Sequence, residues 1–452
     1  MTTEVRFGRL ERRGLLLGLS GTQLGLVGTA LLVLVAAGTA HGPLGITIAA
    51  PLWTVPMILA LTPIGGRPMV EAIPVAIPWV LRRVSGRSVA LARPVRPAPL
   101  VIPGVPIRLR IVEDETGSAV LRTVRRGTGS GPFVVVARVC GRGFLLDEPA
   151  DQDRRVGDWA RLLGSLGQLG HISGVQVLHR TTSDPNRDLR AWWASQARVG
   201  AAWASKVLAE LVEVGADSSR VETLVAVSVR PRRGVTPAGV IAGLTDAFEG
   251  AGLDLDAWLT PRQISRVIHS AYDLAGAAAS DVCGPMGVAE AWSHARSDSA
   301  CHATFWVSEW PRSATHPGFL RTLLLAPGAT RTFSLTAQPL ATGKALREIR
   351  RARAEQTADA ATRARIGQVE DEAARAAAAE LTRREEDLIA GHGDLRFTGL
   401  VAVSASTPAE LDDACAALLS AAGQAGCELR RLVGQQVQAY AAAALPLARV
   451  LS

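Results

Sequence analysis

Four potential metal ligands recur at intervals of four residues in the segment 290–302. They are Glu290, His294, Asp298 and His302. On one continuous helix this spacing would place all four side chains on the same face, where they would form a stripe of zinc ligands. The following residues, ATFWVSEW, are typical of a strand, so we expect the helix to end near Asp298. We therefore favour caps and ion pairs with Arg296 and Arg312, and predict no metal site.

No phosphate-binding loop is present in the sequence. The only Gly-Lys pair is Gly343-Lys344; Gln338 replaces the first glycine of such a loop, and Ala345 stands where a Ser or Thr would bind magnesium. The sequence also lacks a GxSxG elbow and a recognisable Ser/His/Asp arrangement. We predict that the protein is not an enzyme, with no catalytic residue, no nucleotide site and no cofactor. A membrane-tethered enzyme is an alternative against which these absences weigh.

The five cysteines are widely scattered and form no CxxC pair. An odd number without short spacings argues against a disulfide framework and against a structural zinc site. We expect buried free thiols in a reducing compartment.

Two uncharged runs near the N-terminus, 14–40 and 44–66, are each long enough to span a bilayer. A membrane core of about 30 Å requires about 20 helical residues. His41, Gly42 and Pro43 separate the runs. The two runs predict a two-helix transmembrane hairpin over residues 14–66, with a very short polar tip.

Arginines flank this hairpin on both sides and are absent from its tip. They are Arg6, Arg9, Arg12 and Arg13 before it, and Arg67, Arg82, Arg83, Arg87, Arg93 and Arg96 after it. The positive-inside rule then predicts a multi-pass protein of the plasma (inner) membrane with both termini in the cytoplasm. A cleavable signal peptide is the competing interpretation of the first run. The net charge of +8 is concentrated here, which favours the lipid bilayer over nucleic acid as the partner of the basic residues.

The remaining chain divides by composition. We expect a basic cytoplasmic N-terminus (1–13), an interfacial segment with a Pro-rich linker (67–104), an α/β domain (105–343), a long charged helical arm (344–392) and a C-terminal α/β segment that completes the body (393–452). The interfacial segment includes an amphipathic stretch that would place Trp79 at the level of the lipid headgroups. The arm is a solvated or a partner-binding helix.

Strand and helix patterns alternate through the body. Strands are expected at 106–113, 133–139, 172–181, 221–230, 394–406 and 427–433, and helices at 153–170, 189–214, 236–252, 261–273, 407–423 and after 434. This alternation predicts a layered sheet covered by helices, α/β or split α+β. The last 60 residues resemble a second ferredoxin-like half interrupted by the arm. The sequence leaves the strand order open.

The block EAWSHARSDSACHATFWVSEWPR (290–312) resembles a Glu-x-Trp-x-x-x-Arg-x-Asp stretch followed by Trp-x-x-x-Trp-Pro-Arg in a family of actinobacterial membrane proteins. Those proteins are encoded with type IV secretion and conjugation components. The tail GQQVQAYAAAALPL and the two opening spans are similar as well. The resemblance implies a two-helix membrane subunit joined to a domain like the N-terminal part of the conjugative secretion ATPase, without its motor domain.

The resemblance therefore predicts an inner-membrane scaffold of a type IV secretion-like or conjugation apparatus that docks a separate ATPase and other membrane subunits. A homo-oligomer is possible within that scheme. A type VII secretion subunit and a membrane-tethered DNA-handling protein are the alternatives. Trp306, Trp310 and Arg312 are the candidate partner-contact residues, since Trp and Arg dominate interface hot spots. The competing interpretation places both tryptophans in the core and Arg312 in a local ion pair.

Overall fold

The structure is a computed structural model. It describes residues 21–64, 67–91, 100–103, 105, 108–124, 131–141, 143–183, 202–214, 219–274, 284–311, 315–325, 330–340, 342–365, 372–389 and 394–449.

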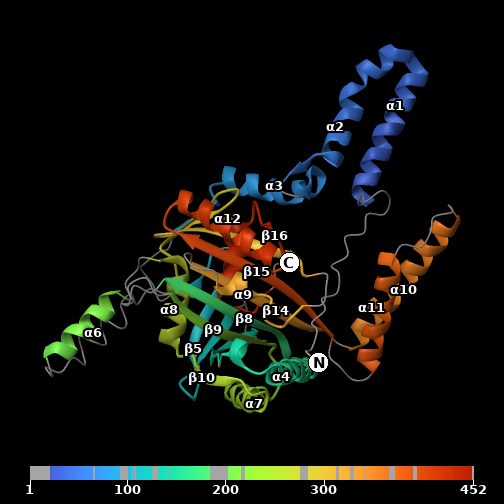
Figure 1. Cartoon of the computed structure of the whole chain (residues 1–452). Coiled ribbons are helices and arrows are strands. Elements are labelled where there is room, and N and C mark those ends of the chain that lie inside the picture. Colours follow the sequence, from blue (N-terminus) through green and yellow to red (C-terminus); the bar gives the residue numbers. More distant parts are fainter. Residues whose placement is uncertain are drawn as a thin grey trace.

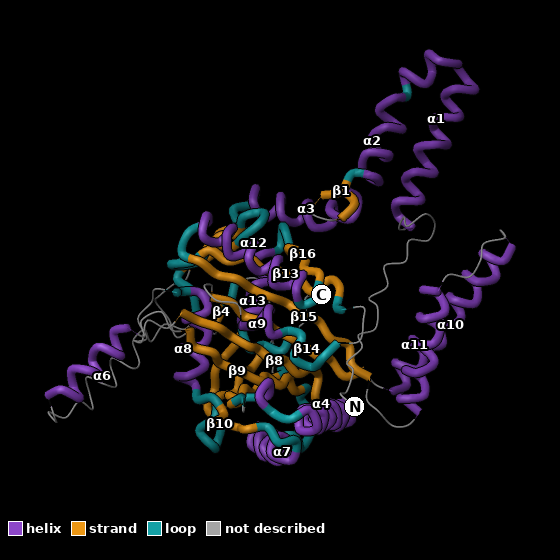
Figure 2. Tube along the Cα trace, viewed as in Figure 1, coloured by secondary structure: helices purple, strands orange, loops and turns teal. Residues whose placement is uncertain are grey.

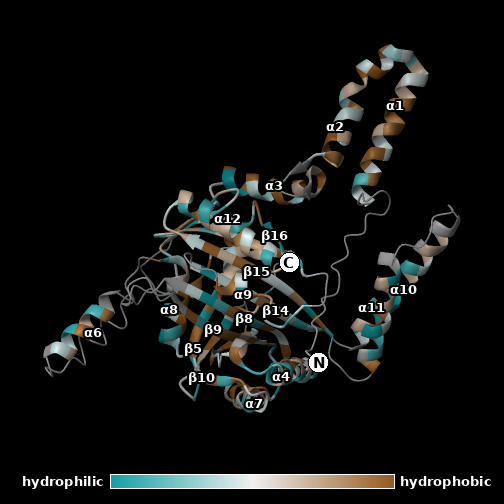
Figure 3. Cartoon of the chain, in the orientation of Figure 1, coloured by the Kyte–Doolittle hydropathy of each residue, from teal (hydrophilic) through white to brown (hydrophobic). Residues whose placement is uncertain are grey.

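Two apolar helices, α1 (Gly21–Ile48) and α2 (Ala50–Leu61), extend away from the body as an antiparallel pair (Figure 1). α1 turns back at Gly42, which has a φ of 61°, just before Pro43. Gln23 Nε2, near the start of α1, donates a hydrogen bond to Ala60 O, near the end of α2, at 2.7 Å. Hydrophobic residues lie along both helices (Figure 3). Among the described residues, α1 is the helix that is long and apolar enough to cross a membrane; α2 is apolar but shorter.

Helix α3 (Met69–Val84) follows α2 after a short hairpin of β1 (Pro63–Ile64) and β2 (Arg67–Pro68). Met69 N donates to Thr62 O at 2.9 Å, so α3 begins directly beside the end of α2. The amphipathic helix expected in this segment is present. Trp79, however, makes an edge contact with Trp292 of the body, with ring centroids 5.0 Å apart. The Trp79 ring therefore packs against the body, and its expected level at the headgroups stays a prediction.

The body is built on one large antiparallel sheet, shown in orange in Figure 2. Its strands are β3 (Val89–Leu91), β4 (Leu100–Val101), β5 (Arg108–Glu113), β6 (Ala119–Val124), β7 (Phe133–Cys140), β8 (Ile172–Ser183), β9 (Ser219–Val229), β10 (Asp254–Trp258), β11 (Gly287–Glu290), β12 (Ala295–Arg296), β13 (Cys301–Glu309), β14 (Thr330–Leu340), β15 (Asp394–Ala405) and β16 (Glu428–Arg431). The main path is β3-β11-β12-β13-β15-β14-β8-β9-β7-β6-β5-β4, with β10 paired to β7 and β16 to β13. β3 and β4 belong to the stretch expected to be an interfacial segment and linker, yet they pair at the two ends of the sheet.

The sheet consists of two halves with the same topology. In the first half the order is β10-β7-β9-β8, and in the second it is β16-β13-β15-β14. When the four strands of each half are numbered along the chain, their order across the sheet is 4-1-3-2. This is the antiparallel order of a βαββαβ ferredoxin-like unit. In both halves a β-hairpin precedes the first strand, β5-β6 in one and β11-β12 in the other. The halves join where β8 pairs with β14.

The helices repeat in the same positions. They are α4 (Pro149–Gln168), α7 (Pro237–Gly250) and α8 (Pro261–Tyr272) in the first half, and α9 (Arg321–Leu325), α12 (Pro408–Gln424) and α13 (Gln436–Ala444) in the second; a 3-10 turn (Phe144–Leu146) precedes α4. α4 and α7 pack on one face of the first half, and α9 and α12 on the same face of the second half. α8 and α13 share a core on the opposite face.

Both halves carry a helical insertion between their second and third strands. α6 (Ala202–Val214) lies between β8 and β9, while α10 (Thr342–Arg365) and α11 (Glu372–Ile389) lie between β14 and β15. The two insertions project from different sides of the body (Figure 1). The expected long arm is thus a helical hairpin, attached through a small cluster of Ala345, Ile349 and Leu388.

Candidate functional site

The two candidate tryptophans lie on opposite faces of the sheet. Trp306 on β13 is half-buried beside the core shared by α8 and α13, and the Arg430 guanidinium lies 4.6 Å from its ring centroid. Trp310 is 7% exposed and belongs to the core beneath α12. A register shift between Val307 and Glu309 precedes Trp310. The two side chains therefore do not form one surface patch. Arg312 lies outside the described residues.

Trp310 sits in a space kept open by Gly399 of β15. A Cβ at Gly399 would lie 2.8 Å from Trp310 Cζ2 and 2.9 Å from Val307 Cγ2. The Trp310 ring makes edge contacts with Phe397 and Phe319, at centroid distances of 5.7 and 6.5 Å. These contacts are those of a packed core residue.

The expected helix through Glu290 and Asp298 is wrong, because the segment forms strands β11 and β12 and the start of β13. Ala291 N donates to His294 O at 2.9 Å and closes the first turn. Asp298 accepts hydrogen bonds from Met286 N and Gly287 N at 2.9 and 2.7 Å. The four side chains are therefore not aligned on one face. Within the described ranges, no group of three or more His, Cys, Asp or Glu side chains is arranged to hold a metal ion.

Glu290 belongs instead to a joint between α3 and the body, which we call the α3 joint; it consists of Val75, Trp79, Arg82, Glu290, Trp292 and Gly434. Arg82 Nε donates to Glu290 Oε2 at 3.1 Å, and Arg82 Nη2 donates to Gly434 O at 2.7 Å. One guanidinium thus links α3 both to strand β11 and to the turn before α13.

The Glu290 carboxylate is 5% exposed. Burial raises its pKa, and Arg82 opposes that rise through charge and hydrogen bonding. A carboxylate in this position requires its cation, because an unpaired buried charge is costly. Arg296 and Arg312 are the ion-pair partners expected from the sequence in this segment, and Arg82 is not among them. Arg312 lies outside the described residues.

Gly434 is required at its position for two reasons. Its φ of 71° is a left-handed conformation that favours glycine. A Cβ there would also lie 2.7 Å from Trp292 Cζ3 and 3.0 Å from Val75 Cγ1. The α3 joint therefore closes tightly over this glycine.

A buried polar cluster connects α8, β13, β15 and α13. His302 is fully buried, with Nε2 2.6 Å from Ser297 Oγ and Nδ1 2.7 Å from Ser404 Oγ. Ser297 donates its own proton to Tyr272 O. Ser297 must then accept from His302 Nε2–H, and Ser404 donates to His302 Nδ1. The His302 ring also stacks on Tyr440, with centroids 3.9 Å apart.

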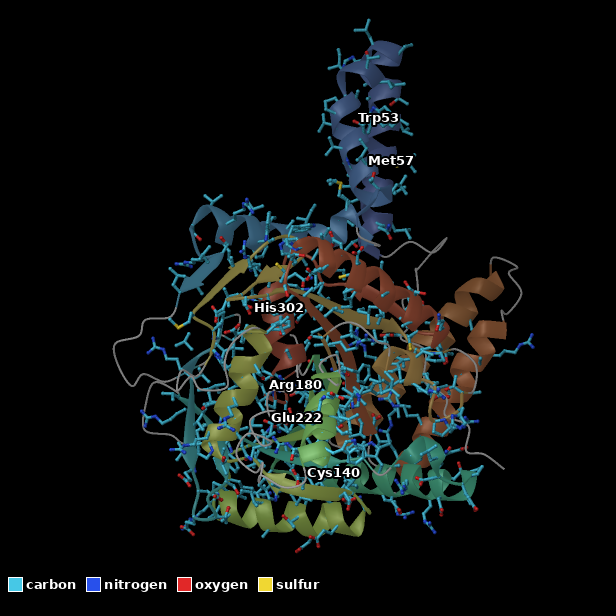
Figure 4. The ribbon with its side chains drawn as sticks, turned by 60° about the vertical axis from the view of Figure 1, so that its left-hand side comes forward. Trp53, Met57, Cys140, Arg180, Glu222 and His302 are labelled. Atoms are coloured by element: carbon cyan, nitrogen blue, oxygen red, sulfur yellow. The ribbon has the colours of Figure 1, made fainter. Side chains whose placement is uncertain are left out.

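Burial lowers the pKa of His302 to about 3 and raises that of Tyr440 to about 12. Both groups are thus neutral over the ordinary pH range. Figure 4 places His302 inside the body, with Arg180 and Glu222 below it. Arg180 Nη1 lies 3.2 Å from Glu222 Oε2, and Arg180 Nη2 donates to Ser270 Oγ at 3.0 Å. The ion pair and the hydrogen bond of Arg180 thus link β8 to β9 and to α8.

Four cysteines, Cys140, Cys301, Cys415 and Cys427, are free thiols. Three of them are buried as expected, whereas Cys140 is exposed, and the prediction of burial is wrong there. Burial raises the pKa of the last three, that of Cys427 to about 11. A raised pKa reduces the thiolate fraction, so these three thiols are poor nucleophiles and metal ligands. Cys283 lies outside the described residues.

Arg82 and Gly434 were not among the candidate residues from the sequence. Arg82 was counted only as part of the basic flank of the membrane segments, and a single glycine before a Gln-rich helix carries no distinguishing pattern. In comparisons with known proteins, no family model matches the chain and no curated protein matches it. The resemblance to the secretion-associated family therefore stays a prediction.

Proposed function

We propose that the protein is a membrane-anchored scaffold of a type IV secretion-like or conjugation apparatus, which holds its body at the cytoplasmic face of the membrane and docks a separate ATPase. The observation that supports the membrane anchor in this proposal is the hydrogen bond between Gln23 and Ala60. It brings the two ends of the apolar helical pair together on the side where α3 meets the body.

The lengths of the two apolar segments support the proposed hairpin. The helical segment before Gly42 and the one after it each contain about 20 described residues. Each is about 30 Å long, which matches a bilayer core. Large aliphatic side chains are exposed along both segments, among them Leu32, Ile48 and Leu52. Lipid would cover these side chains, and the flanking arginines favour cytoplasmic ends.

The way in which the charged arm, α10 and α11, is attached to the sheet supports the scaffold role. α10 and α11 are inserted between two strands that pair up to Leu340 and Asp394, so the arm projects from a closed ladder. Ion pairs such as Arg353 with Glu385 and Arg384 with Asp394 hold it in shape. A charged helical hairpin on a rigid base suits contact with a partner protein, and the resemblance names an ATPase as that partner.

The test is co-purification of the full chain with a secretion ATPase from its native cells, after mild detergent solubilisation. A variant in which residues 342–392 are replaced by a short turn between β14 and β15 removes the arm. The matched control replaces residues 184–218, the corresponding insertion between β8 and β9. We expect the wild type and the control to retain the ATPase and the arm deletion to lose it.

Failure of the wild-type chain to retain any motor protein would contradict the proposal. Retention by the arm deletion at the wild-type level would contradict the assignment of the arm as the contact. Recovery of DNA in place of an ATPase, with a steep loss at higher salt, would favour the DNA-handling alternative.

A further inference from the structure

Helix α3 has two apolar faces. Val75, Trp79 and Arg82 follow the i, i+4, i+7 pattern of one face, and this face makes the α3 joint. Ile77, Leu81 and Val84 follow the same pattern two residues further on. Since each residue advances by about 100°, this second row lies about 200° round the helix, opposite the body.

The second row is exposed in the folded chain. Ile77 is 55% exposed, Leu81 62% and Val84 82%. Soluble surfaces carry scattered single aliphatic residues, whereas three large ones in line mark an interaction surface. A helix that packs one face on a body and leaves an apolar row on the other requires a second apolar environment.

The position of α3 in the chain identifies that environment. The hydrogen bond from Met69 N to Thr62 O joins its first residue to the end of α2, so α3 begins where the apolar hairpin ends. Arg83 and Arg87 are exposed near its other end. Arginines beside an apolar row are typical of helices that lie in the interface of a membrane with anionic lipids.

We propose that α3 lies between the bilayer and the body, with Ile77, Leu81 and Val84 inserted among the lipid headgroups while the α3 joint holds the body against the other side. This inference rests on the proposed membrane hairpin and adds a second contact to it. α3 thereby fixes the orientation of the sheet relative to the membrane plane. Trp79, the aromatic residue expected at the headgroups, contributes its ring to the joint.

Lipid-attached quenchers test this arrangement in the full chain. The chain, with Cys140 and Cys283 replaced by Ser, is reconstituted in vesicles of phosphatidylcholine and phosphatidylglycerol. A thiol-reactive fluorophore is placed in turn at Leu81→Cys, Val84→Cys, Leu32→Cys on α1, and Leu169→Cys, an exposed leucine after α4. The chain without an added cysteine gives the background from the buried thiols.

We expect nitroxides near the headgroups to quench the probes at positions 81 and 84 about twofold, since interfacial helices lie only about 5–10 Å deep. Deep nitroxides should quench the probe at position 32, and neither should affect position 169. Quenching at 32 without quenching at 81 and 84 would overturn this inference and leave the membrane hairpin intact. Absence of quenching at all sites would overturn the hairpin itself. Shielding of position 81 from a soluble quencher without lipid quenching would show a protein on this row, and would also overturn the inference.

Discussion

Arg82 on α3 and Glu290 on β11 are 208 residues apart in the sequence, yet their side chains form an ion pair at 3.1 Å. Together with the hydrogen bond from Arg82 to Gly434, this pair connects the helix that follows the apolar hairpin to the second half of the sheet. The Arg82 guanidinium thus helps to fix the orientation of α3 on the body, together with the Trp79–Trp292 contact. The first half of the sheet follows α3 in the chain but receives its position through the second half.

Replacement of Arg82 by Met should destabilise the body. Breaking a buried pair costs about 3–5 kcal/mol, and because Arg82 is a quarter exposed we expect about 2 kcal/mol. The measurement is thermal or denaturant unfolding of the full chain in detergent at pH 7. Arg87→Met, at an exposed arginine beyond the helix, is the matched control and should change little.

The double variant Arg82→Met with Glu290→Gln should recover part of the loss, because it removes the buried charge as well as its partner. If the double variant loses as much unfolding free energy as the two single variants together, the pair does not couple α3 to β11.

Acidification should destabilise the protein through His302. Its pKa is about 3 in the folded chain and rises to its ordinary value of 6.5 on unfolding. Below 6.5 the unfolded chain therefore binds a proton that the folded chain does not. This contribution to stability is complete above pH 6.5 and is lost as pH falls from there towards 3, by at most about 1.4 kcal/mol per pH unit. Burial also lowers the pKa values of His179 and His294, which act in the same direction.

Glu290 acts in the opposite direction. Its raised pKa lets the folded chain take up a proton at a higher pH than the unfolded chain, which favours folding in acid. Unfolding of the Glu290→Gln variant should therefore become easier with falling pH more steeply than unfolding of the wild type. As pH falls, the His302→Gln variant should lose less unfolding free energy than the wild type does. The control is His316→Gln, at an exposed histidine, which should lose as much as the wild type. An unchanged slope in the His302 variant would contradict the account.

Gly399→Ala should destabilise the second half of the sheet. The added methyl group would overlap the Trp310 ring, and overpacking a core costs about 1–3 kcal/mol. Combining it with Trp310→Leu should restore part of the stability, although Trp310→Leu alone is destabilising. The check is a double-mutant cycle of unfolding free energies. Strict additivity would show that Gly399 and Trp310 are not in contact.

Alanine substitutions at Trp306 and Trp310 should lower the free energy of unfolding by different amounts. Trp310→Ala removes a buried ring and should cost about 3–5 kcal/mol. Trp306→Ala removes a half-buried ring and its contact with Arg430, so the loss should be smaller, about 1–2 kcal/mol. Equal losses would contradict the difference in burial between the two rings.

Local patterns predicted most helices and strands of the described body. Thr236 followed by Pro237, and Thr407 followed by Pro408, indicated helix starts, and α7 and α12 begin there with the threonine side chains accepting from Gly239 N and Glu410 N. These signals lie within a few residues of one another, so a single sequence contains them. The almost wholly apolar run at 133–139 likewise predicted β7, which pairs with β6, β9 and β10.

Long-range relations could not be predicted in this way. The matching order of the two halves depends on pairings such as β8 with β14, which no local pattern specifies. The four-residue spacing from Glu290 to His302 arises in a series of short strands and turns, and it imitates a helical face. The α3 joint combines residues from three distant segments, and each of its members is ordinary in its own context.

We propose that the two apolar segments on either side of Gly42 cross the membrane as a hairpin, with the body on the cytoplasmic side. The most direct measurement is labelling of intact cells with a membrane-impermeant maleimide. Single cysteines are placed at His41, at the tip, and at Ser452, at the C-terminal end, in a chain that lacks Cys140 and Cys283. The account predicts labelling at position 41 in intact cells and labelling at position 452 only after the membrane is opened. Labelling at position 452 in intact cells, or at neither position until the cells are opened, would contradict it.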